Sequence, residues 1–247
     1  MATAHDALLK AVTLDFWDTI YEATSSPNRV RRRHESLQRM LQRVGAEVPA
    51  EEFARLYRAS AVEADRWWAE EHRGYSTADR IRWLLAQLAI ERPRDCEHIA
   101  RAVEEVDESL LAFPPALLPG AADGIRALAL RFKLAIVSDT GFASGHAQNK
   151  LLEQDGLLEH FSATAYSMDV GHSKPRPEPF RRALELLDVH PGEAVHVGDI
   201  ERTDVAGALA VGMRAIRLDV RRSDGSSEAE IVATSYGELV EYLVAGC

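Results

Sequence analysis

The sequence has little of what marks disulfide-rich, cysteine-metal or membrane proteins. Only two of its 247 residues are cysteines, Cys96 and Cys247, and they lie far apart in the chain. This spacing excludes a disulfide framework, a redox pair and a cysteine zinc motif. No apolar run approaches the roughly 20 residues that cross a bilayer, and the first residues lack the charged and apolar regions of a secretory signal. We therefore expect a cytoplasmic protein with no membrane partner.

Positive charge is also scarce. The chain carries 29 Lys and Arg against 39 Asp and Glu, which gives a formal net charge of -10. An acidic chain of this kind is unsuited to general electrostatic attraction to nucleic acid or to an anionic membrane surface. An anionic ligand would therefore need local positive charge to hold it. The hydrophobic content of 46% supports one large domain or two modest ones.

Short apolar segments rich in β-formers predict a parallel sheet. Segments of this kind are typical of strands buried on both faces, and they lie at 10–16, 133–139, 163–167, 194–199 and 214–219. Helical patterns accompany the later strands at 121–131, 144–156, 177–189 and 204–212. This alternation predicts an α/β fold with a doubly wound, Rossmann-like parallel sheet.

A helical insertion is predicted between the first two strands. Residues 22–118 show helical periodicity and almost no strand signal, with candidate helices at 28–44, 50–72, 77–90 and 95–112. Prolines at 49, 93 and within 114–120 stand where proline can punctuate helices. We therefore predict two domains: a Rossmann-like core formed by residues 1–21 and 119–247, and an α-helical insertion formed by residues 22–118.

Polar side chains follow the ends of the predicted strands. Asp15 ends the first strand, Ser138 and Asp139 end the second, Lys174 follows the third and Asp199 ends the fourth. The carboxyl ends of parallel strands share one edge of the sheet, where ligands bind. Two carboxylates at that edge repel each other unless a cation lies between them. Because these ligands are hard oxygens without histidine or cysteine, they favour Mg²⁺.

In this order the motifs resemble those of the haloacid dehalogenase superfamily. They are "VTLDFWDT", the strand-ending Ser138, Lys174 in "SKPRPEPF", and "VGDIERTD". The resemblance covers essentially the whole chain and implies that the insertion is a cap that closes over the site and selects the substrate. It also implies a Mg²⁺-dependent hydrolase of a small phosphorylated metabolite, acting as a monomer or as a cap-mediated homodimer.

The resemblance implies a role for each motif. Asp15 would attack phosphorus and form an aspartyl-phosphate. Mg²⁺ would be bound by Asp15, by the backbone carbonyl of Trp17 and by Asp199. Ser138 would bind a phosphate oxygen, although it could simply end its strand. Lys174 would balance the charge of the nucleophile and the phosphate.

Residues beside these motifs are expected to complete the site. Asp204, in "VGDIERTD", would orient Lys174 or a metal-bound water, and its alternative is an N-cap for the helix that follows. The expected substrate contacts are Phe16, Trp17, Asp139 and His172.

Trp17 departs from the family pattern. Most phosphatases of the superfamily carry an aspartate two residues after the nucleophile, where it acts as acid and base, a contribution of about 10²–10⁴-fold. Indole cannot transfer that proton. Asp18 stands where glycine is usual, so it either replaces the missing acid or serves only a turn. Glu22 and His34, near the expected hinge, or the substrate itself are the other candidates.

Three other functions compete with that of a phosphatase. Phosphonate-cleaving relatives use a cap lysine, and no lysine occurs between Lys10 and Lys133, which strongly disfavours that chemistry. Metal-independent dehalogenases lack the Gly-Asp pair at 198–199, so dehalogenation is disfavoured. A weak or inactive member that binds a phosphorylated ligand or a partner is favoured by Trp17.

The basic run 29–34 is expected to be a solvated helix face, with the alternative that one arginine faces the ligand.

Overall fold

The computed structural model describes residues 8–90, 97–221 and 225–245. Contacts divide the chain into two compact units. The core unit comprises Met1–Ala23, Ala116–Asp139 and Leu152–Cys247, and the helical unit comprises Thr24–Pro115 and Thr140–Leu151. Both cysteines of the sequence, Cys96 and Cys247, lie outside the described residues.

The core unit is built on a six-stranded sheet with the order β3-β2-β1-β4-β5-β6, in which every pair of neighbours is parallel. The strands are β1 (Ala11–Leu14), β2 (Lys133–Ser138), β3 (Phe161–Tyr166), β4 (Ala194–Gly198), β5 (Arg214–Leu218) and β6 (Val232–Ala233). The predicted doubly wound parallel sheet is confirmed. Since β1 pairs with β2 and β4, the residues that follow these three strands lie at one edge.

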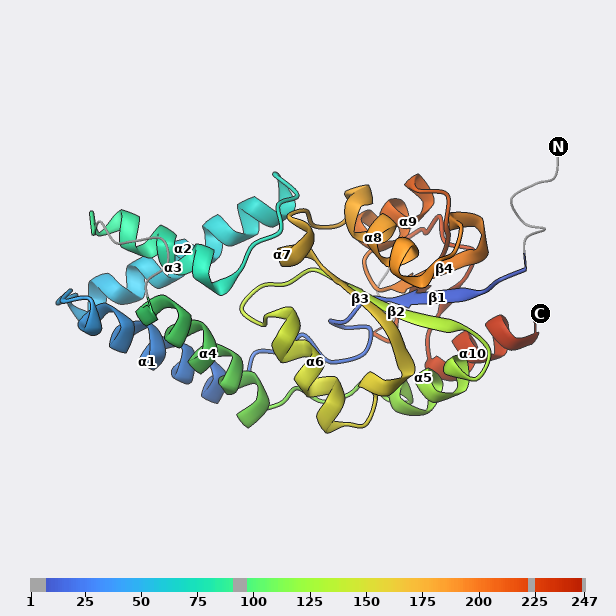
Figure 1. Cartoon of the computed structure of the whole chain (residues 1–247), viewed down its shortest axis with the longest axis horizontal. Coiled ribbons are helices and arrows are strands. Elements are labelled where there is room, and N and C mark those ends of the chain that lie inside the picture. Colours follow the sequence, from blue (N-terminus) through green and yellow to red (C-terminus); the bar gives the residue numbers. More distant parts are fainter. Residues whose placement is uncertain (1–7, 91–96, 222–224, 246–247) are drawn as a thin grey trace. The chain divides into compact units, whose positions relative to one another are not determined.

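Helices cover both faces of this sheet. α5 (Ala121–Ala129) and α10 (Tyr236–Ala245) lie on one face, and α8 (Pro177–Leu187) and α9 (Ala206–Ala210) lie on the other (Figure 1). Buried side chains of the sheet, of α8 and α9 and of the residues just before α9 and β5 form one hydrophobic cluster, which includes Val137, Phe180, Leu184, Val205 and Met213. Short helices complete the unit: η1 (Leu158–His160), α7 (Ser167–Val170), η2 (Pro191–Glu193) and the π-helical turn η3 (Glu201–Val205).

The helical unit contains α1 (Pro27–Arg43), α2 (Ala50–Ala69), α3 (Thr77–Gln87), α4 (Glu97–Ala112) and most of α6 (Gly145–Gln154). The four helices predicted for the insertion are confirmed, and positions 95 and 96 of the last one lie outside the described residues. Local signals fix where two of them begin. The Ser26 hydroxyl accepts a hydrogen bond from the Asn28 N–H ahead of α1, and Ser76 and Asp79 form a capping box at α3.

The segment that follows β2 belongs to the helical unit by its contacts. Ser144 donates to the Asp107 carboxylate through its N–H and its hydroxyl at 3.1 and 2.6 Å, and the Thr77 hydroxyl donates to the Phe142 carbonyl at 3.2 Å. Residues 140–151, which the sequence analysis assigns to the core, therefore group with α3 and α4. The predicted cap boundaries, 22 and 118, stay a prediction.

Helix length and composition also bear on the expected absence of a membrane partner. Across the described ranges, no helix is both long and apolar enough to pass through a bilayer.

Candidate active site

Asp15 lies directly after β1, at the centre of the sheet edge. Its N–H donates to the Val197 carbonyl at 2.8 Å, which fixes the backbone against β4. Its side chain is almost fully buried, with 6% of the residue exposed. The Asp15 carboxylate accepts a hydrogen bond from Lys174 Nζ at 2.5 Å. The structure thus brings together two residues that are 159 positions apart in the chain.

Lys174 joins two carboxylates. Its Nζ also donates to Asp204 Oδ1 at 2.6 Å, and only 2% of the residue is exposed. Its backbone N–H donates to Asp139 Oδ1 at 3.0 Å. Asp139 therefore anchors the segment that carries Lys174, and the substrate contact expected of Asp139 stays a prediction. Lys174 is enclosed by acidic groups, as a charge-balancing lysine requires.

Asp204 is oriented by η3. Its Oδ2 accepts from the Ile200 N–H at 3.0 Å and from the Thr203 hydroxyl at 3.3 Å, while Oδ1 accepts from Lys174. A π-helical turn of this kind is often found at functional sites. The alternative that Asp204 caps the following helix is wrong, because Val205 holds the N-cap position of α9 and makes no side-chain cap bond.

Gly198, the last residue of β4, makes room for Asp204. A Cβ atom at Gly198 would lie 2.4 Å from Asp204 Cγ, closer than any real contact allows. The glycine of the Gly-Asp pair is therefore a packing requirement as well as part of a motif.

His196 is a site residue that the sequence analysis missed. It lies in β4, is fully buried, and places Nε2 3.2 Å from Asp204 Oδ1 and Nδ1 2.8 Å from Thr13 Oγ1. Burial lowers the pKa of His196, although the Asp204 carboxylate opposes the shift. A neutral ring beside an ionised carboxylate donates from Nε2 and accepts the Thr13 hydroxyl at Nδ1.

The charges at this edge are unbalanced. Burial raises the pKa of Asp15 well above its ordinary value, against Lys174 and with added repulsion from Asp204 and Asp199. Burial, together with Asp204 and Asp18, raises the pKa of Asp199 to about 7 in spite of Lys174. Burial alone would also raise the pKa of Asp204, but Lys174 and His196 outweigh it and lower that pKa.

The donor set can be tested against the predicted Mg²⁺. Within the described part of the chain, no group of three or more His, Cys, Asp and Glu is arranged around one metal position. The ligand set expected for the ion, Asp15, Asp199 and the backbone carbonyl of Trp17, contains only two acidic side chains and stays a prediction. Mg²⁺ binds through one or two carboxylates and keeps its remaining positions for waters and a phosphate. The excess of negative charge and the hard oxygen ligands fit this ion.

Trp17 and Phe16 pack together beside the nucleophile. The Phe16 side chain is fully buried, stacks on Tyr21 with centroids 5.0 Å apart and meets the Trp17 ring edge-on at 4.9 Å. This burial leaves only the backbone of Phe16 for the predicted substrate contact. Trp17 is half-buried.

Asp18 forms a turn. Its φ of 52° is left-handed, which explains why glycine suits this position. Its Oδ1 accepts from the Ala23 N–H at 2.9 Å and from Arg221 at 2.5 Å. These bonds favour the turn role over the acid–base role.

The other predicted residues lie as follows. Ser138 is fully buried at the end of β2, with its hydroxyl 3.5 Å from the Asp139 carbonyl, and His172 is half-buried two residues before Lys174. Their phosphate contacts stay predictions. Glu22 belongs to the core unit, and His34 lies on α1 in the helical unit, against the ring of Tyr57.

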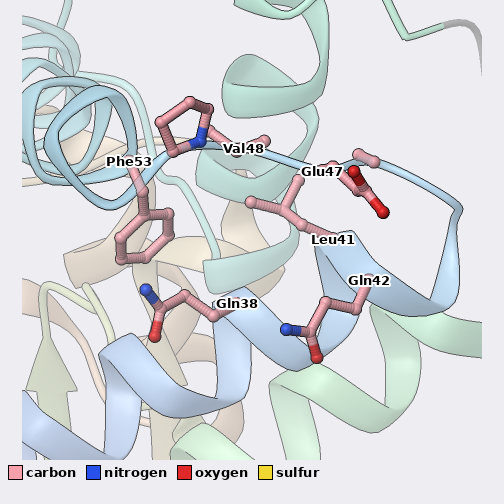
Figure 2. Close-up of a pocket in the computed structure, with 8 residues that line it drawn as sticks. Gln38, Leu41, Gln42, Glu47, Val48 and Phe53 are labelled. Atoms are coloured by element: carbon pink, nitrogen blue, oxygen red, sulfur yellow. The ribbon is translucent and has the colours of Figure 1, made fainter.

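A pocket of about 760 Å³ lies elsewhere, between α1 and the start of α2 in the helical unit (Figure 2). It is lined by Gln38, Leu41, Gln42, Ala46, Glu47, Val48, Pro49 and Phe53. None of the predicted site residues is among them, and Glu47 is the one ionisable side chain in the lining. This pocket is therefore separate from the residues proposed for catalysis, although its volume is large enough for a ligand.

The chain is similar to known proteins over most of its length. The family model described as haloacid dehalogenase-like hydrolase matches residues 9–212. Haloacid dehalogenase-like hydrolase domain-containing protein 3 of Bos taurus is 30% identical over 175 residues, which are 68% of each chain. A ribulose-1,5-bisphosphate 5-phosphatase of Halopiger xanaduensis is 29% identical over 78% of this chain and 79% of its own. A phosphoserine phosphatase of Thermus thermophilus is 38% identical over 100 residues, and the match spans only 39% of that protein.

Solved structures share the fold. A 2-haloacid dehalogenase from Pseudomonas syringae has a TM-score of 0.69 at 25% identity, with 97% of this chain and 100% of that one covered. A phosphatase from Thermococcus onnurineus has a TM-score of 0.67 at 24% identity, covering 96% of this chain and 99% of its own. The hydrolase YfnB from Bacillus subtilis, whose structure holds magnesium, reaches 0.60 at 20% identity, with coverage of 96% and 99%.

Proposed function

The chain belongs to the haloacid dehalogenase-like hydrolases, and from this premise we propose that it is a Mg²⁺-dependent hydrolase of a small phosphorylated metabolite. The observation that carries the proposal is the buried Lys174 ammonium, which joins the Asp15 and Asp204 carboxylates at 2.5 and 2.6 Å. Burial raises the pKa of Asp15, and Lys174 opposes this shift and favours the ionised carboxylate. In a site with little water, the charge of that carboxylate interacts strongly with a phosphoryl group.

The proposed reaction has two displacements. An Asp15 carboxylate oxygen attacks phosphorus while the bond from phosphorus to the leaving oxygen breaks, and water then attacks the aspartyl-phosphate and releases phosphate and Asp15. Lys174 balances the charge of the nucleophile and the phosphoryl oxygens, and Asp204 holds Lys174 in place. Bound to Asp15, Asp199 and the Trp17 carbonyl, Mg²⁺ would neutralise further charge on the phosphoryl group.

In this mechanism no side chain is assigned to protonate the leaving oxygen. Indole supplies no proton, and the Asp18 carboxylate accepts hydrogen bonds from Ala23 and Arg221. We therefore expect the enzyme to favour substrates whose leaving oxygen departs without protonation. In a series of aryl phosphates, kcat/KM should fall steeply as the pKa of the leaving phenol rises. A flat dependence would reveal an acid in the protein.

One experiment tests the proposed activity directly. Purified protein is assayed on a panel of phosphorylated metabolites and p-nitrophenyl phosphate, with Mg²⁺ and with EDTA. We expect turnover that EDTA removes and that Asp15→Asn abolishes. Asp123→Asn is the matched control, because that carboxylate lies exposed on α5. Equal activity of wild type and Asp15→Asn would contradict the assignment of the nucleophile.

Two other functions are outcomes of the same experiment. The likeness to the Pseudomonas syringae dehalogenase favours dehalogenation as the second candidate, and it predicts haloacetate turnover in EDTA. A binding protein without activity would hydrolyse nothing in the panel and yet be thermally stabilised by one member of it. The oligomeric state, monomer or cap-mediated homodimer, stays a prediction.

A further inference from the structure

Three arginines of the helical unit are buried or partly buried without an acidic partner. Arg29 and Arg33 lie on α1, and Arg80 lies on α3. Arg29 is 3% exposed and Arg80 is 6% exposed, whereas Arg33 is half-buried. Among the described residues, none of the three forms a salt bridge, and the buried Nε atom of each has no hydrogen-bond partner. These three side chains are called the arginine cluster below.

The neighbours of the arginine cluster are neutral. Arg29 donates to the Thr24 carbonyl, Arg80 donates to the Ser60 hydroxyl at 2.9 Å, and Arg33 is hydrogen-bonded to Tyr57. None of these partners carries a negative charge at neutral pH. Each guanidinium group thus keeps its full charge while much of its water is removed.

Aromatic rings fix two of the guanidinium groups. Phe142 has Arg80 Cζ 3.7 Å and Arg33 Cζ 4.7 Å from its ring centroid. Tyr57 stacks on Phe142 with an interplanar angle of 12° and lies 5.9 Å from Arg80 Cζ. Contact with aromatic faces orients the guanidinium groups but does not neutralise them.

The three charges repel one another. Burial lowers the pKa of Arg33, and the charges of Arg29 and Arg80 lower it further against the effect of Tyr57. Burial also lowers the pKa of Arg80, and Tyr75, Tyr57 and the exposed Asp65 oppose this shift. The cluster therefore lacks an anion.

Four other arginines of α1 and α2 form ion pairs with glutamates of the helical unit. Arg39 and Arg43 pair with Glu105, Arg55 pairs with Glu52, and Arg66 pairs with Glu63. Arg39 and Arg43, which are half-buried like Arg33, thus have a carboxylate partner, whereas the members of the arginine cluster do not. The helical unit thus contains acidic side chains that pair with arginine, so a general lack of acidic residues does not explain why the arginine cluster has no acidic partner.

We propose that Arg29, Arg33 and Arg80 form an oxyanion-binding site that takes a phosphate or carboxylate group. The planar guanidinium group matches such an anion with two parallel N–H donors, and a group held in place beforehand loses little freedom on binding. The buried Nε2 atom of His34, which also has no partner in the described structure, provides a further polar contact. The anion is either a free oxyanion or a second anionic group of the substrate, and the latter source rests on the proposed function.

Binding is tested with inorganic phosphate as the probe. The full chain is titrated in EDTA with Asp15→Asn as the background, and the arginine Nε–H signals are followed by NMR. We expect Arg33→Gln and Arg80→Gln to weaken one phosphate-binding event at least tenfold and to remove its Nε–H shifts. The control is Arg58→Gln, an exposed arginine of α2. Unchanged phosphate affinity in both cluster variants would overturn the proposal.

Thermal unfolding separates this role from a purely structural one. Without phosphate, loss of an uncompensated charge should leave the Tm of Arg33→Gln equal to or above that of wild type, and phosphate should raise the wild-type Tm more. If Arg80→Gln fails to fold, Arg80→Lys keeps the charge without the paired donors and should still bind phosphate less tightly. A large fall in Tm with full phosphate affinity would mean that the cluster only supports the helices.

Kinetics distinguish the two sources of the anion. If the anion is part of the substrate, Arg33→Gln should lower kcat/KM for substrates with two anionic groups at least tenfold more than for p-nitrophenyl phosphate. If it is a free oxyanion, added sulfate should change wild-type turnover and not that of Arg33→Gln. Should no phosphate ester be hydrolysed at all, the proposed function fails, and the titration still decides whether the site exists.

Discussion

Asp18 adopts a backbone conformation that aspartate tolerates and glycine prefers, and its carboxylate closes the turn by accepting the Ala23 N–H. Asparagine keeps both properties but cannot act as an acid. We expect Asp18→Asn to change kcat by less than about threefold, whereas the loss of a true acid–base group costs about 10²–10⁴-fold. Steady-state assays on p-nitrophenyl phosphate measure the difference. A hundredfold loss with an unchanged Tm would assign the acid to Asp18.

His196 acts through Asp204. Its Nε2 atom donates to the same carboxylate oxygen that accepts from Lys174, so it holds that oxygen where the lysine needs it. Removal of the outer hydrogen-bond partner of a metal ligand typically costs about 10–100-fold, and His196 orients Asp204 in a comparable way. We expect His196→Asn to lower kcat by about tenfold and to leave KM within about twofold, because His196 does not touch the substrate.

A matched control distinguishes positioning from general loss of packing at His196. Thr13→Val removes the hydrogen bond on the far side of the ring and keeps the volume. It should lower stability slightly and kcat less than His196→Asn does. If both variants lose the same activity in proportion to Tm, His196 is a core residue only.

At the scale of elements, α1 and α4 are joined by charge as well as by apolar contacts. Glu105 of α4 accepts hydrogen bonds from Arg39 at 2.6 Å and from Arg43 at 3.1 Å. Burial alone would raise the pKa of Glu105, but the bonds from Arg39, Ser36 and Arg43 outweigh it and lower the pKa to about 2. A depressed pKa means that the folded state gains stability above the unfolded pKa near 4.5 and loses it as the pH falls toward 2.

This linkage gives a prediction for Glu105→Gln. After a discount for the solvent that reaches both arginines, the interactions of Glu105 with Arg39 and Arg43 contribute about 1–2 kcal/mol to the free energy of unfolding at neutral pH. We expect the variant to be less stable by that amount at pH 7 and nearly equal to wild type at pH 2.5. Denaturant unfolding at both values measures the change. Glu104→Gln, exposed on the same helix, should show no such pH dependence.

The elements themselves were predictable in proportion to their length and pattern. The five strands with long apolar runs and the helices of the insertion were predicted, because each carries its own periodicity. β6 has two residues, too few for any pattern, and η3 differs from an α-helix by hydrogen bonds that the sequence does not display. The helix α10 was not assigned. The grouping of residues 140–151 depends on bonds to Thr77 and Asp107, which lie far away in the chain.

At the scale of the whole molecule, the sequence predicted the meeting of Asp15, Lys174 and Asp204 because parallel topology brings strand ends to one edge. It missed His196, whose partner Thr13 lies opposite it in the register of β1 and β4. Two polar residues inside apolar strands were the available signal.

The solvated face expected for 29–34 is wrong for Arg29, which is buried. Arg29 and Arg33 are four residues apart on α1 and therefore share one face of the helix.

Charge balance also predicts how the whole protein responds to a divalent ion. Asp15, Asp199 and Asp204 repel one another around the single ammonium of Lys174, and a bound cation would relieve this repulsion. A ligand at a hundred times its Kd adds about 2.7 kcal/mol to stability. For a chain of this size that is a rise in Tm of about 5–10 °C. We expect Mg²⁺ to produce such a rise at pH 7.5, and EDTA to reverse it.

The variant Asp199→Asn tests most directly whether Mg²⁺ stabilises the protein by binding at this site. Removing one of the three repelling carboxylates should raise the Tm in EDTA, because burial and neighbouring acids already disfavour the ionised form of Asp199. The same change removes a ligand, so Mg²⁺ should no longer stabilise the protein. Asp123→Asn should keep the full response, and NaCl at equal ionic strength should not reproduce it. An undiminished Mg²⁺ response in Asp199→Asn would place the ion elsewhere, and calorimetry would show this whether or not any substrate is turned over.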